Sequence, residues 1–326
     1  MPAKSKLYQR FYAWKLALNK DERWCILITA DPDALASAMA LKRLLYRQGR
    51  EIVIASTNCI TRPDNLAMLR YLRIPIVQWQ EEMKNDFQRF AIVDSQPHHN
   101  KAFADINFSI IIDHHPMPDN YCHLAEFIDI RPEMGATSSI MYQYLNALSI
   151  RPSKLLATAL QYGIRTDTGL FERGGIAADF IAYQKLARYS DSSLLSRILR
   201  SEYLPEWLPL FAYAFRSLRT CKKGAHAHVG KVNSPDMLVA IADFFTRVYG
   251  LRWVAVSGIF EETLVIIFRG DGSRHIGNMA KNCFASLGSA GGHRNLARAE
   301  IAFEQLGECK VADFVFNKLC QIRKKS

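Results

Sequence analysis

Residues 24–48 read WCILITADPDALASAMALKRLLYRQ, and this stretch decides the fold class. Its first part, Trp24–Thr29, is a near-continuous apolar run, which is typical of a short strand buried on both faces. From Ala34 to Gln48 the apolar residues recur instead at the spacing of one face of a helix. Between the two stands Asp31-Pro32-Asp33, a good capping sequence for a helix start. The stretch therefore predicts a strand that turns directly into a helix.

The same alternation continues through the first half of the chain. Short runs rich in isoleucine, valine and phenylalanine predict further strands, and one more helix separates them: Ile52–Ser56, Ile76–Trp79, Phe90–Asp94 and Phe108–Asp113, with the helix at Asp64–Leu72. Strands that alternate with helices form a parallel sheet through right-handed crossovers. Residues 135–218 look helical, and a second α/β pattern resumes after residues 222–224. We predict an α/β chain with a parallel-sheet domain over 1–200, a helical connector over 201–230 and a smaller α/β domain over 231–326.

The composition is that of a globular protein. Of 326 residues, 49% are hydrophobic and 22% are charged, and no apolar run approaches the ~20 residues that cross a bilayer. The net charge of +11 favours encounters with anions such as nucleotides, RNA or acidic membranes, without selecting among them. The seven cysteines are odd in number and form no Cys-x-x-Cys pair. That pattern favours reduced thiols in a cytoplasmic compartment over a disulfide frame or a zinc site.

Acidic and histidine side chains follow several of the predicted elements. The first strand runs into Asp31-Pro32-Asp33, the fourth ends at Asp94, the fifth ends at Asp113-His114-His115, and the helix Ser153–Ile164 leads to Asp167. The carboxyl ends of the strands in an open parallel sheet form its ligand crevice. Carboxylates gathered there repel one another unless a cation lies among them, and aspartates with one imidazole suit Mn²⁺ or Mg²⁺. Because a single aspartate after a strand is usually a turn or cap residue, the prediction of a metal site depends on their joint occurrence.

Four segments resemble, in the same order, the four motifs of the DHH phosphoesterase superfamily. They are residues 31–38 (DPDALASA), 93–97 (VDSQP), 112–116 (IDHHP) and 162–168 (YGIRTDT). Residues 288–293 (GSAGGH) resemble the glycine-rich motif of the C-terminal substrate-binding domain that accompanies DHH domains. The resemblance is strongest to the nanoRNase and pAp-phosphatase branch, which are manganese enzymes acting on very short RNAs and on 3′-phosphoadenosine 5′-phosphate (pAp).

The resemblance implies a role for each matching side chain. One metal ion would be held by Asp33, Asp94, His114 and Asp167, and a second ion by Asp31 together with Asp94, which would bridge the two. His115 would lie near the scissile phosphate, and Asp113 would orient its neighbours. Substrate contacts would come from the C-terminal domain, through Arg269, Gly291, Gly292, His293 and Arg294.

Two departures from the family pattern concern the first metal and the substrate. The family's first motif opens with a metal-binding histidine, whereas here Thr29-Ala30 precedes Asp31 and no histidine occurs before His98. His98 or His99 is a candidate replacement, although histidines in loops are common without such a role. After the glycines the family continues with small residues, whereas this chain has residues 294–299 (RNLARA). Their side chains either block the substrate or grip its phosphates.

Two classes of function remain open. The retained aspartates and His114 favour a manganese-dependent phosphoesterase that hydrolyses short oligoribonucleotides or a nucleotide phosphate such as pAp. Loss of the first-motif histidine favours a catalytically weakened family member that binds nucleotide or RNA, and a pyrophosphatase or cyclic-dinucleotide phosphodiesterase is a further alternative. We expect one or two Mn²⁺ ions, with Mg²⁺ as the alternative, and a short RNA or nucleotide as the partner. We also expect a cytoplasmic location without membrane association, with a homodimer as one candidate assembly.

Overall fold

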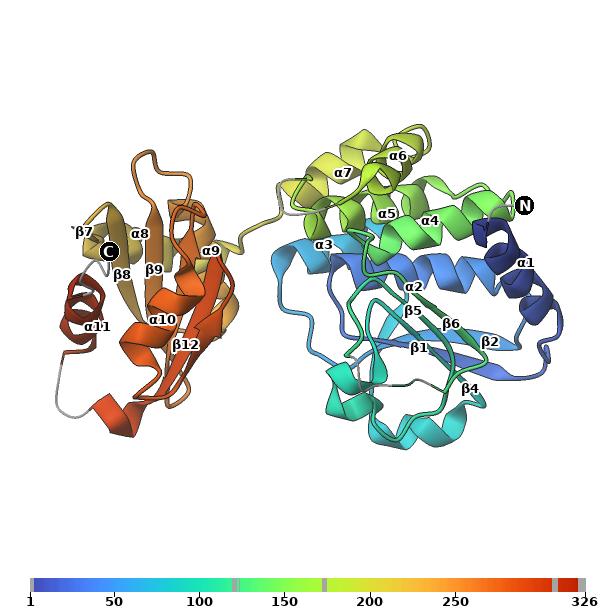
Figure 1. The fold of residues 1–326 in the computed structure, drawn as a ribbon, viewed down its shortest axis with the longest axis horizontal. Coiled ribbons are helices and arrows are strands. Elements are labelled where there is room, and N and C mark those ends of the chain that lie inside the picture. Colours follow the sequence, from blue (N-terminus) through green and yellow to red (C-terminus); the bar gives the residue numbers. More distant parts are fainter. Residues whose placement is uncertain (1–2, 119–121, 123, 172–174, 307–309, 322–326) are drawn as a thin grey trace. The chain divides into compact units, whose positions relative to one another are not determined.

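The computed structural model describes residues 3–118, 122, 124–171, 175–306 and 310–321 (Figure 1). The chain divides into two compact units, Met1–Glu202 and Tyr203–Ser326. Each unit combines one six-stranded sheet with helices, so the chain has the α/β architecture that the sequence predicts. Among the described residues, none of the helices has the length and apolar character needed to span a membrane.

The first unit is built on a parallel sheet with the strand order β3-β2-β1-β4-β5-β6. Its strands are β1 (Arg23–Ile28), β2 (Glu51–Ser56), β3 (Ile76–Gln78), β4 (Arg89–Val93), β5 (Phe108–Asp113) and β6 (Phe127–Ile130). The first five agree with the predicted strands to within one residue. The short edge strand β6 was not predicted, because the buried Asp129 interrupts its apolar pattern. In the structure that carboxylate is paired with Arg131 at 2.7 Å.

Both faces of this sheet are covered, which explains why its strands are apolar throughout. Trp24, Ile26 and Ile28 of β1 point into the main core with the helices, whereas Cys25 and Leu27 point into a second core on the other face. The helices of this unit are α1 (Ala3–Leu16), α2 (Pro32–Leu44), α3 (Pro63–Leu72), α4 (Thr137–Ala147), α5 (Lys154–Asp167), α6 (Ala177–Leu186) and α7 (Ser192–Leu199). Helices α2, α4 and α5 lie along one face of the sheet, and short 3₁₀ turns lie on the other side (Figure 1).

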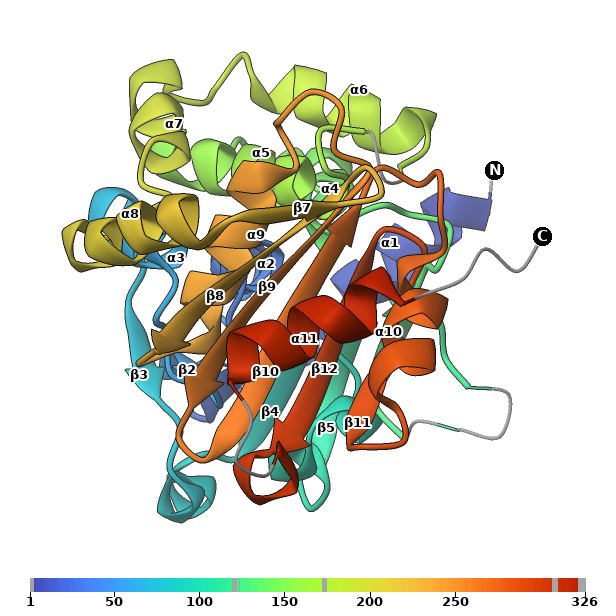
Figure 2. The same cartoon turned by 90° about the vertical axis from the view of Figure 1, so that its left-hand side faces the viewer.

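The second unit is built on a mixed sheet with the strand order β11-β12-β10-β9-β8-β7. Its strands are β7 (Arg219–Cys221), β8 (Gly224–Lys231), β9 (Trp253–Phe260), β10 (Thr263–Gly270), β11 (Ser289–Gly292) and β12 (Leu296–Ala302). Only β8 and β9 are parallel, and the other pairs are antiparallel. Helices α8 (Leu208–Ser217) and α9 (Pro235–Phe245) share one core with the sheet. Helices α10 (Ile276–Phe284) and α11 (Val311–Cys320) share the other core and lie in front of the strands in Figure 2.

The prediction of a helical connector over 201–230 is wrong in its second half. Helix α8 lies there, but β7 and β8 follow it, and both strands belong to the second unit. Strand β8 reads GAHAHVGK, and its apolar signal is too weak to predict a strand. Contacts in the fold explain its composition: Gly224 lies against the ring of Trp253, and His226 is buried next to Ser257. Strand β11, which lies within the glycine-rich motif at 288–293, and helix α11 were also not predicted.

One pair of cysteines departs from the predicted reduced state. Cys221 at the end of β7 is paired in a disulfide with Cys320 at the end of α11, and their Cα atoms are 6.0 Å apart, a usual separation for disulfides. The prediction that all thiols are reduced is therefore wrong for this pair. The free cysteines are Cys25, Cys59, Cys122 and Cys283, and Cys309 lies outside the described residues.

His226 and His228 of β8 make the second unit sensitive to acid. His226 Nε2 lies 2.8 Å and His228 Nδ1 lies 3.0 Å from the hydroxyl oxygen of Ser257 on β9. Burial, reinforced by the charges of His228 and Arg219, lowers the pKa of His226 to about 3 from 6.5. Below pH 6.5, His226 therefore becomes protonated in the unfolded chain but stays neutral in the folded unit. The contribution of His226 to the free energy of unfolding is complete above pH 6.5 and decreases as the pH falls towards 3. We expect a loss of about 3 kcal/mol in the free energy of unfolding by pH 4.

Urea unfolding at pH 7 and pH 4, followed by tryptophan fluorescence, measures this loss. His226→Leu is expected to lose much less stability on acidification than the unsubstituted protein. His293→Leu changes an exposed histidine in the same unit and should keep the original pH dependence. An unchanged pH dependence in His226→Leu would show that acid destabilises the unit through other groups.

Candidate metal centre

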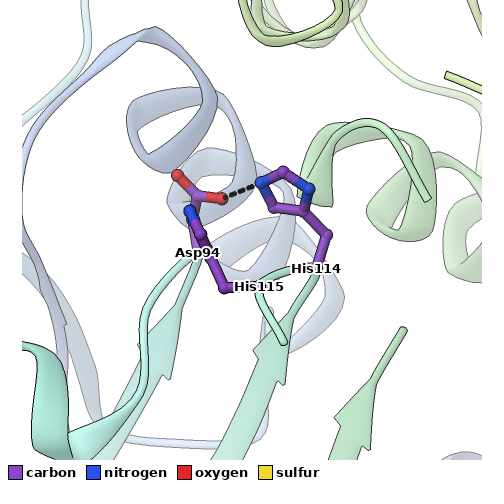
Figure 3. Close-up of side chains that lie close together, drawn as sticks. All are labelled: Asp94, His114 and His115. Atoms are coloured by element: carbon purple, nitrogen blue, oxygen red, sulfur yellow. Dashed lines mark ion pairs between the residues drawn. The ribbon is translucent and has the colours of Figure 1, made fainter. Parts of the chain in front are cut away.

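Side chains from four elements converge beyond the carboxyl ends of β1, β4 and β5. Asp33 lies in the first turn of α2, Asp94 follows β4, His114 follows β5, and Asp167 ends α5. Each offers one ligand atom, and these four atoms lie within 4.8 Å of one another. Figure 3 shows the side chain of Asp94 close to those of His114 and His115 at the ends of two neighbouring strands. The structure thus brings together the four residues that were predicted to share one ion.

His114 is oriented as metal-binding histidines are. Its Nδ1 lies 3.2 Å from the carbonyl oxygen of Met134, whereas its Nε2 lies 3.2 Å from Asp167 Oδ2 and 3.6 Å from Asp94 Oδ1. A histidine that gives one ring N–H to a backbone carbonyl presents its other nitrogen to a metal. Within the described part of the chain, this buried Nε2 has no partner with hydrogen-bond geometry. The nitrogen therefore faces the carboxylates of Asp167 and Asp94, at the point where a metal ion would replace its proton.

The protonation of His114 reflects the same surroundings. Burial opposes its charged form, but the nearby carboxylates of Asp167 and Asp33 outweigh burial and raise the pKa of His114 to about 9. Without a metal, the imidazole therefore holds a proton at neutral pH. That proton supplies part of the positive charge that the surrounding carboxylates require, which a divalent cation would supply more fully.

The amino end of α4 fixes two of the carboxylates. Asp33 Oδ2 accepts a hydrogen bond from the backbone N–H of Thr137 at 2.6 Å, and Oδ1 accepts one from the N–H of Ser138 at 2.8 Å. The Thr137 hydroxyl donates to Asp94 Oδ1 at 2.8 Å. The positive end of a helix stabilises such anions. Sequence reasoning missed this role of Thr137 and Ser138, because the run GATSS at 135–139 is only a helix-start pattern in itself.

Burial and mutual repulsion raise the pKa of each carboxyl in the cluster. For Asp33, burial and then the charge of Asp167 raise the pKa to about 6. Burial, followed by the charges of Asp33 and Asp31, raises the pKa of Asp94 well above its usual value. Asp94 also has a φ of 59°, a left-handed conformation that costs most residues ~1–2 kcal/mol. Unfavourable backbone geometry and perturbed pKa values at one place are typical of a functional site.

His115 is held by Asp113 next to the cluster. Its Nδ1 lies 2.9 Å from Asp113 Oδ1, and Gln96 Nε2 donates to Asp113 Oδ2 at 2.7 Å. The hydrogen bond to Asp113 is the main cause of a raised His115 pKa. One ring nitrogen of His115 also lies within 4.8 Å of the ligand atoms of Asp94 and His114. With 43% of its side chain exposed, His115 can contact a molecule that approaches the cluster.

Asp31 lies outside the group of four. It caps α2, where its Oδ1 accepts a hydrogen bond from the N–H of Ala34 at 2.8 Å. Of the two candidate replacement histidines, His99 is the one near the centre: its ligand atom lies within 4.8 Å of those of Asp113 and His115. Among the described residues, His98 belongs to no such group.

Gly163 of α5 lies directly against Asp33, a contact that sequence reasoning did not use. A Cβ atom at this position would lie 3.0 Å from Asp33 Oδ1 and 3.1 Å from its Cα, and it would be closer still to the hydroxyl of Ser138. Only a residue without a side chain therefore lets α5 approach the cluster this closely. One feature of the sequence could have indicated this contact: a glycine stands inside a predicted helix, where it destabilises the helix by ~1 kcal/mol relative to alanine.

The donor set fits a divalent cation. Three carboxylates and one imidazole offer oxygen and nitrogen ligands, which suit Mn²⁺ or Mg²⁺, and the cluster contains no thiolate of the kind found in structural zinc sites. The carboxylates of the cluster repel one another around His114 Nε2, and a cation at that point would offset their charge.

A family match covers most of this centre. Residues 24–164 match the DHH family, N-terminal domain, a range that contains Asp33, Asp94 and His114 and ends three residues before Asp167. The N-terminal unit belongs to the DHH family.

Individual proteins resemble larger parts of the chain. An uncharacterized protein of Methanocaldococcus jannaschii is 37% identical over 276 residues, which are 84% of this chain and 56% of that protein. A probable bifunctional oligoribonuclease and PAP phosphatase of Streptococcus mutans is 26% identical over 206 residues, which are 60% of this chain and 61% of that protein. The chain thus spans little more than half the length of these relatives.

A solved structure supports the fold of the whole chain. An exopolyphosphatase-related protein from Bacteroides fragilis is similar with a TM-score of 0.74 at 17% sequence identity, over 97% of this chain and 95% of that one. At this identity the likeness shows a shared fold and nothing finer.

The substrate residues expected from the DHH resemblance lie in the second unit. Gly291 and Gly292 end β11, and the turn that follows lies against the start of α10, where the carbonyl oxygen of His293 accepts a hydrogen bond from the N–H of Gly277 at 2.8 Å. Arg294 Nε donates to the carbonyl oxygen of Gly272 at 2.9 Å. These four residues therefore lie in one hairpin.

Arg269 is placed differently from the hairpin residues. It is the last residue but one of β10, and its Nε donates to Asp243 Oδ1 of α9 at 2.6 Å. Val265 and Ile267, which alternate with it along β10, belong to the core beneath α8 and α9. Arg269 thus projects from the α9 face of the sheet, whereas α10 packs on the other face.

Proposed function

We propose that this chain is a divalent-metal-dependent phosphoesterase that hydrolyses short oligoribonucleotides or a nucleotide phosphate such as pAp, with Mn²⁺ as its working ion. The observation that carries the proposal is the convergence of Asp33, Asp94, His114 and Asp167. Membership of the N-terminal unit in the DHH family supports the reaction class. The similarity to the Streptococcus mutans protein supports the substrate class. We include a cytoplasmic location in the proposal: among the described cysteines four are free, although Cys221 and Cys320 form a disulfide.

The four clustered residues would hold one ion, and Asp31 with Asp94 would contribute to a second. His99 is our candidate for the missing histidine of that second site. When bound, such ions polarise a phosphoryl oxygen and lower the pKa of a coordinated water. The protein's own contribution is position: the N–H groups of α4 hold Asp33 and the Thr137 hydroxyl holds Asp94, so both carboxylates are in place before substrate arrives.

His115 would act on the substrate itself. Asp113 fixes the ring through Nδ1, and this hydrogen bond raises the pKa of His115, which favours the protonated imidazolium. A charged N–H next to the cluster would donate to a phosphate oxygen and neutralise charge that develops there. Since Asp113 is fully buried, it would orient His115 without touching substrate.

A binding protein without efficient catalysis is the second candidate. The observation that favours it is the pair Thr29-Ala30, which stands where the family carries a metal-binding histidine. A site with one fewer neutral ligand would hold its ion more weakly. Such a protein would still recognise a nucleotide through the remaining centre.

Hydrolysis assays separate these two functions. With Mn²⁺ we expect release of mononucleotide from a diribonucleotide or of phosphate from pAp, and we expect Asp167→Asn to lower the rate more than ~100-fold, since it weakens a direct metal ligand. Product release followed by anion-exchange chromatography measures this rate. Asp105→Asn, which changes an exposed aspartate near the amino end of β5, is the matched control and should keep full activity.

Each contrary result has a distinct meaning. Mn²⁺-dependent binding of either substrate without product would establish the binding protein. Full activity in EDTA would exclude a metal-dependent reaction. Full activity of Asp167→Asn would place the reaction elsewhere in the chain.

A further inference from the structure

A basic pocket lies in the first unit among helices α3, α5 and α7. These helices contact one another, and they are labelled in Figure 1. The pocket has a volume of about 550 Å³ and is lined by Arg70, Tyr71, Arg73, Lys154, Leu155, Leu194 and Arg197. Binding sites for small molecules typically measure ~300–1,000 Å³. The pocket is therefore large enough for a ligand of nucleotide size.

The charge of the lining is entirely positive. Four of the seven residues are cationic and none is acidic. Lys154 lies 3.6 Å from Asp191, and its side chain is 75% exposed, so that pair offsets one charge weakly. Among the residues that the structure describes, Arg70, Arg73 and Arg197 form no ion pair with a carboxylate. Three guanidinium groups with uncompensated charge around one hollow favour an anionic ligand.

The remaining lining residues are apolar or aromatic. Leu155, Leu194 and the half-buried Tyr71 form this part of the wall, and the guanidinium carbon of Arg197 lies 4.1 Å from the centre of the Tyr71 ring. A planar guanidinium binds phosphate through two parallel hydrogen bonds, and the guanidinium of Arg197 stacked on Tyr71 offers a flat surface for a ring. The wall is thus suited to a ligand that combines a phosphate with a ring.

The pocket is separate from the metal centre. Helix α5 begins with Lys154 and Leu155 in the pocket and ends with Asp167 in the metal centre. Lys154 and Asp167 are 13 residues apart, which corresponds to roughly 20 Å along the helix axis. The pocket therefore lies at the amino end of α5, where the helix dipole adds positive potential for an anion.

We propose that this pocket is a second binding site, for a phosphorylated ligand that carries a flat ring, such as a nucleoside monophosphate. The arginines bind the phosphate, and the stacked pair of Arg197 and Tyr71, together with the neighbouring leucines, contacts the ligand's ring. The site requires no metal, so it differs from the metal centre in position and in chemistry.

Calorimetric titration at low salt, in EDTA, tests this site in the 326-residue chain carrying Asp94→Asn, so that no substrate is turned over. The probes are adenosine 5′-monophosphate, inorganic phosphate and adenosine. We expect the monophosphate to bind more tightly than phosphate, and we expect no measurable binding of adenosine. Arg197→Ala should weaken monophosphate binding at this site about tenfold, and adding Arg70→Ala should weaken it further, as expected for lost charged hydrogen bonds.

Arg47→Ala provides the matched control. Arg47 is exposed in the same unit, and its guanidinium also lies over a tyrosine ring, Tyr46, at 5.3 Å, but it does not line the pocket. This variant should bind as the parent does. The proposal is overturned if the Arg70→Ala, Arg197→Ala variant also binds as the parent does, or if the parent binds none of the three probes.

Discussion

Asp94→Asn is expected to make the metal-free protein more stable while removing Mn²⁺ binding and hydrolysis. The folded carboxyl has a raised pKa because of its burial and the charges of Asp33 and Asp31. The folded protein therefore holds a proton that the unfolded chain releases above about pH 4, and the stability of the unsubstituted protein falls as pH rises from there to the raised pKa. Asparagine carries no such penalty. We expect the gap in the free energy of unfolding to widen as the pH rises above about 4, because the unsubstituted protein loses stability there and the variant does not.

Asparagine is the informative substitution because it preserves the local structure. It tolerates the left-handed φ of 59° at this position, whereas alanine would add backbone strain. Its side-chain oxygen still accepts the hydrogen bond that Thr137 donates to Asp94. The stability change therefore reports the charge alone.

Two measurements check this expectation. Urea unfolding in EDTA at pH 5, 6, 7 and 8 gives the stability gap, and calorimetry with Mn²⁺ gives the metal affinity, which we expect to fall more than ~100-fold. Asp105→Asn, which removes an exposed charge, should change neither quantity. A pH-independent gap would show that Asp94 is ionised in the metal-free protein without electrostatic cost, and unchanged Mn²⁺ affinity would remove Asp94 from the site.

The fold of the first unit could be predicted from local sequence because its sheet is buried on both faces. Strand β5 is apolar almost throughout, and its predicted bounds agree with the structure. The same criterion fails for β8, whose glycines and histidines are explained only by contacts with Trp253 and Ser257 on the next strand. Those partners lie about thirty residues further along the chain, and nothing in residues 224–231 indicates them.

In the candidate site, too, the residues that local sequence predicts differ from those that depend on contacts between distant segments. Asp33, Asp94 and His114 could be predicted because each follows a strand of one parallel sheet, and the carboxyl ends of such strands meet. The supporting contacts could not be predicted. The N–H of Thr137 reaches Asp33 across 104 positions of sequence, and the disulfide between β7 and α11 likewise joins segments 99 residues apart.

Gly163→Ala is expected to reverse the usual effect of this substitution in a helix. Helix propensity alone would stabilise the protein by up to ~1 kcal/mol. Here the new methyl group would meet Asp33 and Ser138 in a fully buried interface, and overpacking of this kind costs ~1–3 kcal/mol. We expect a net loss of about 1–2 kcal/mol in the free energy of unfolding. We also expect hydrolysis to fall more than tenfold, because a displaced Asp33 no longer meets its partners at the ion.

A double variant distinguishes the two contacts of the new methyl group. Adding Ser138→Gly removes the hydroxyl that is nearest to it but keeps the backbone N–H that Asp33 accepts. Stability, measured by urea unfolding in EDTA, should then recover in part, whereas Mn²⁺ affinity and the rate of hydrolysis should stay low because the methyl group still presses on Asp33. Recovery of all three would assign the whole effect to Ser138. If Gly163→Ala alone proved more stable and fully active, α5 would not pack against the metal centre as closely as the structure places it, and the position of Asp167 at the end of the same helix would lose its support.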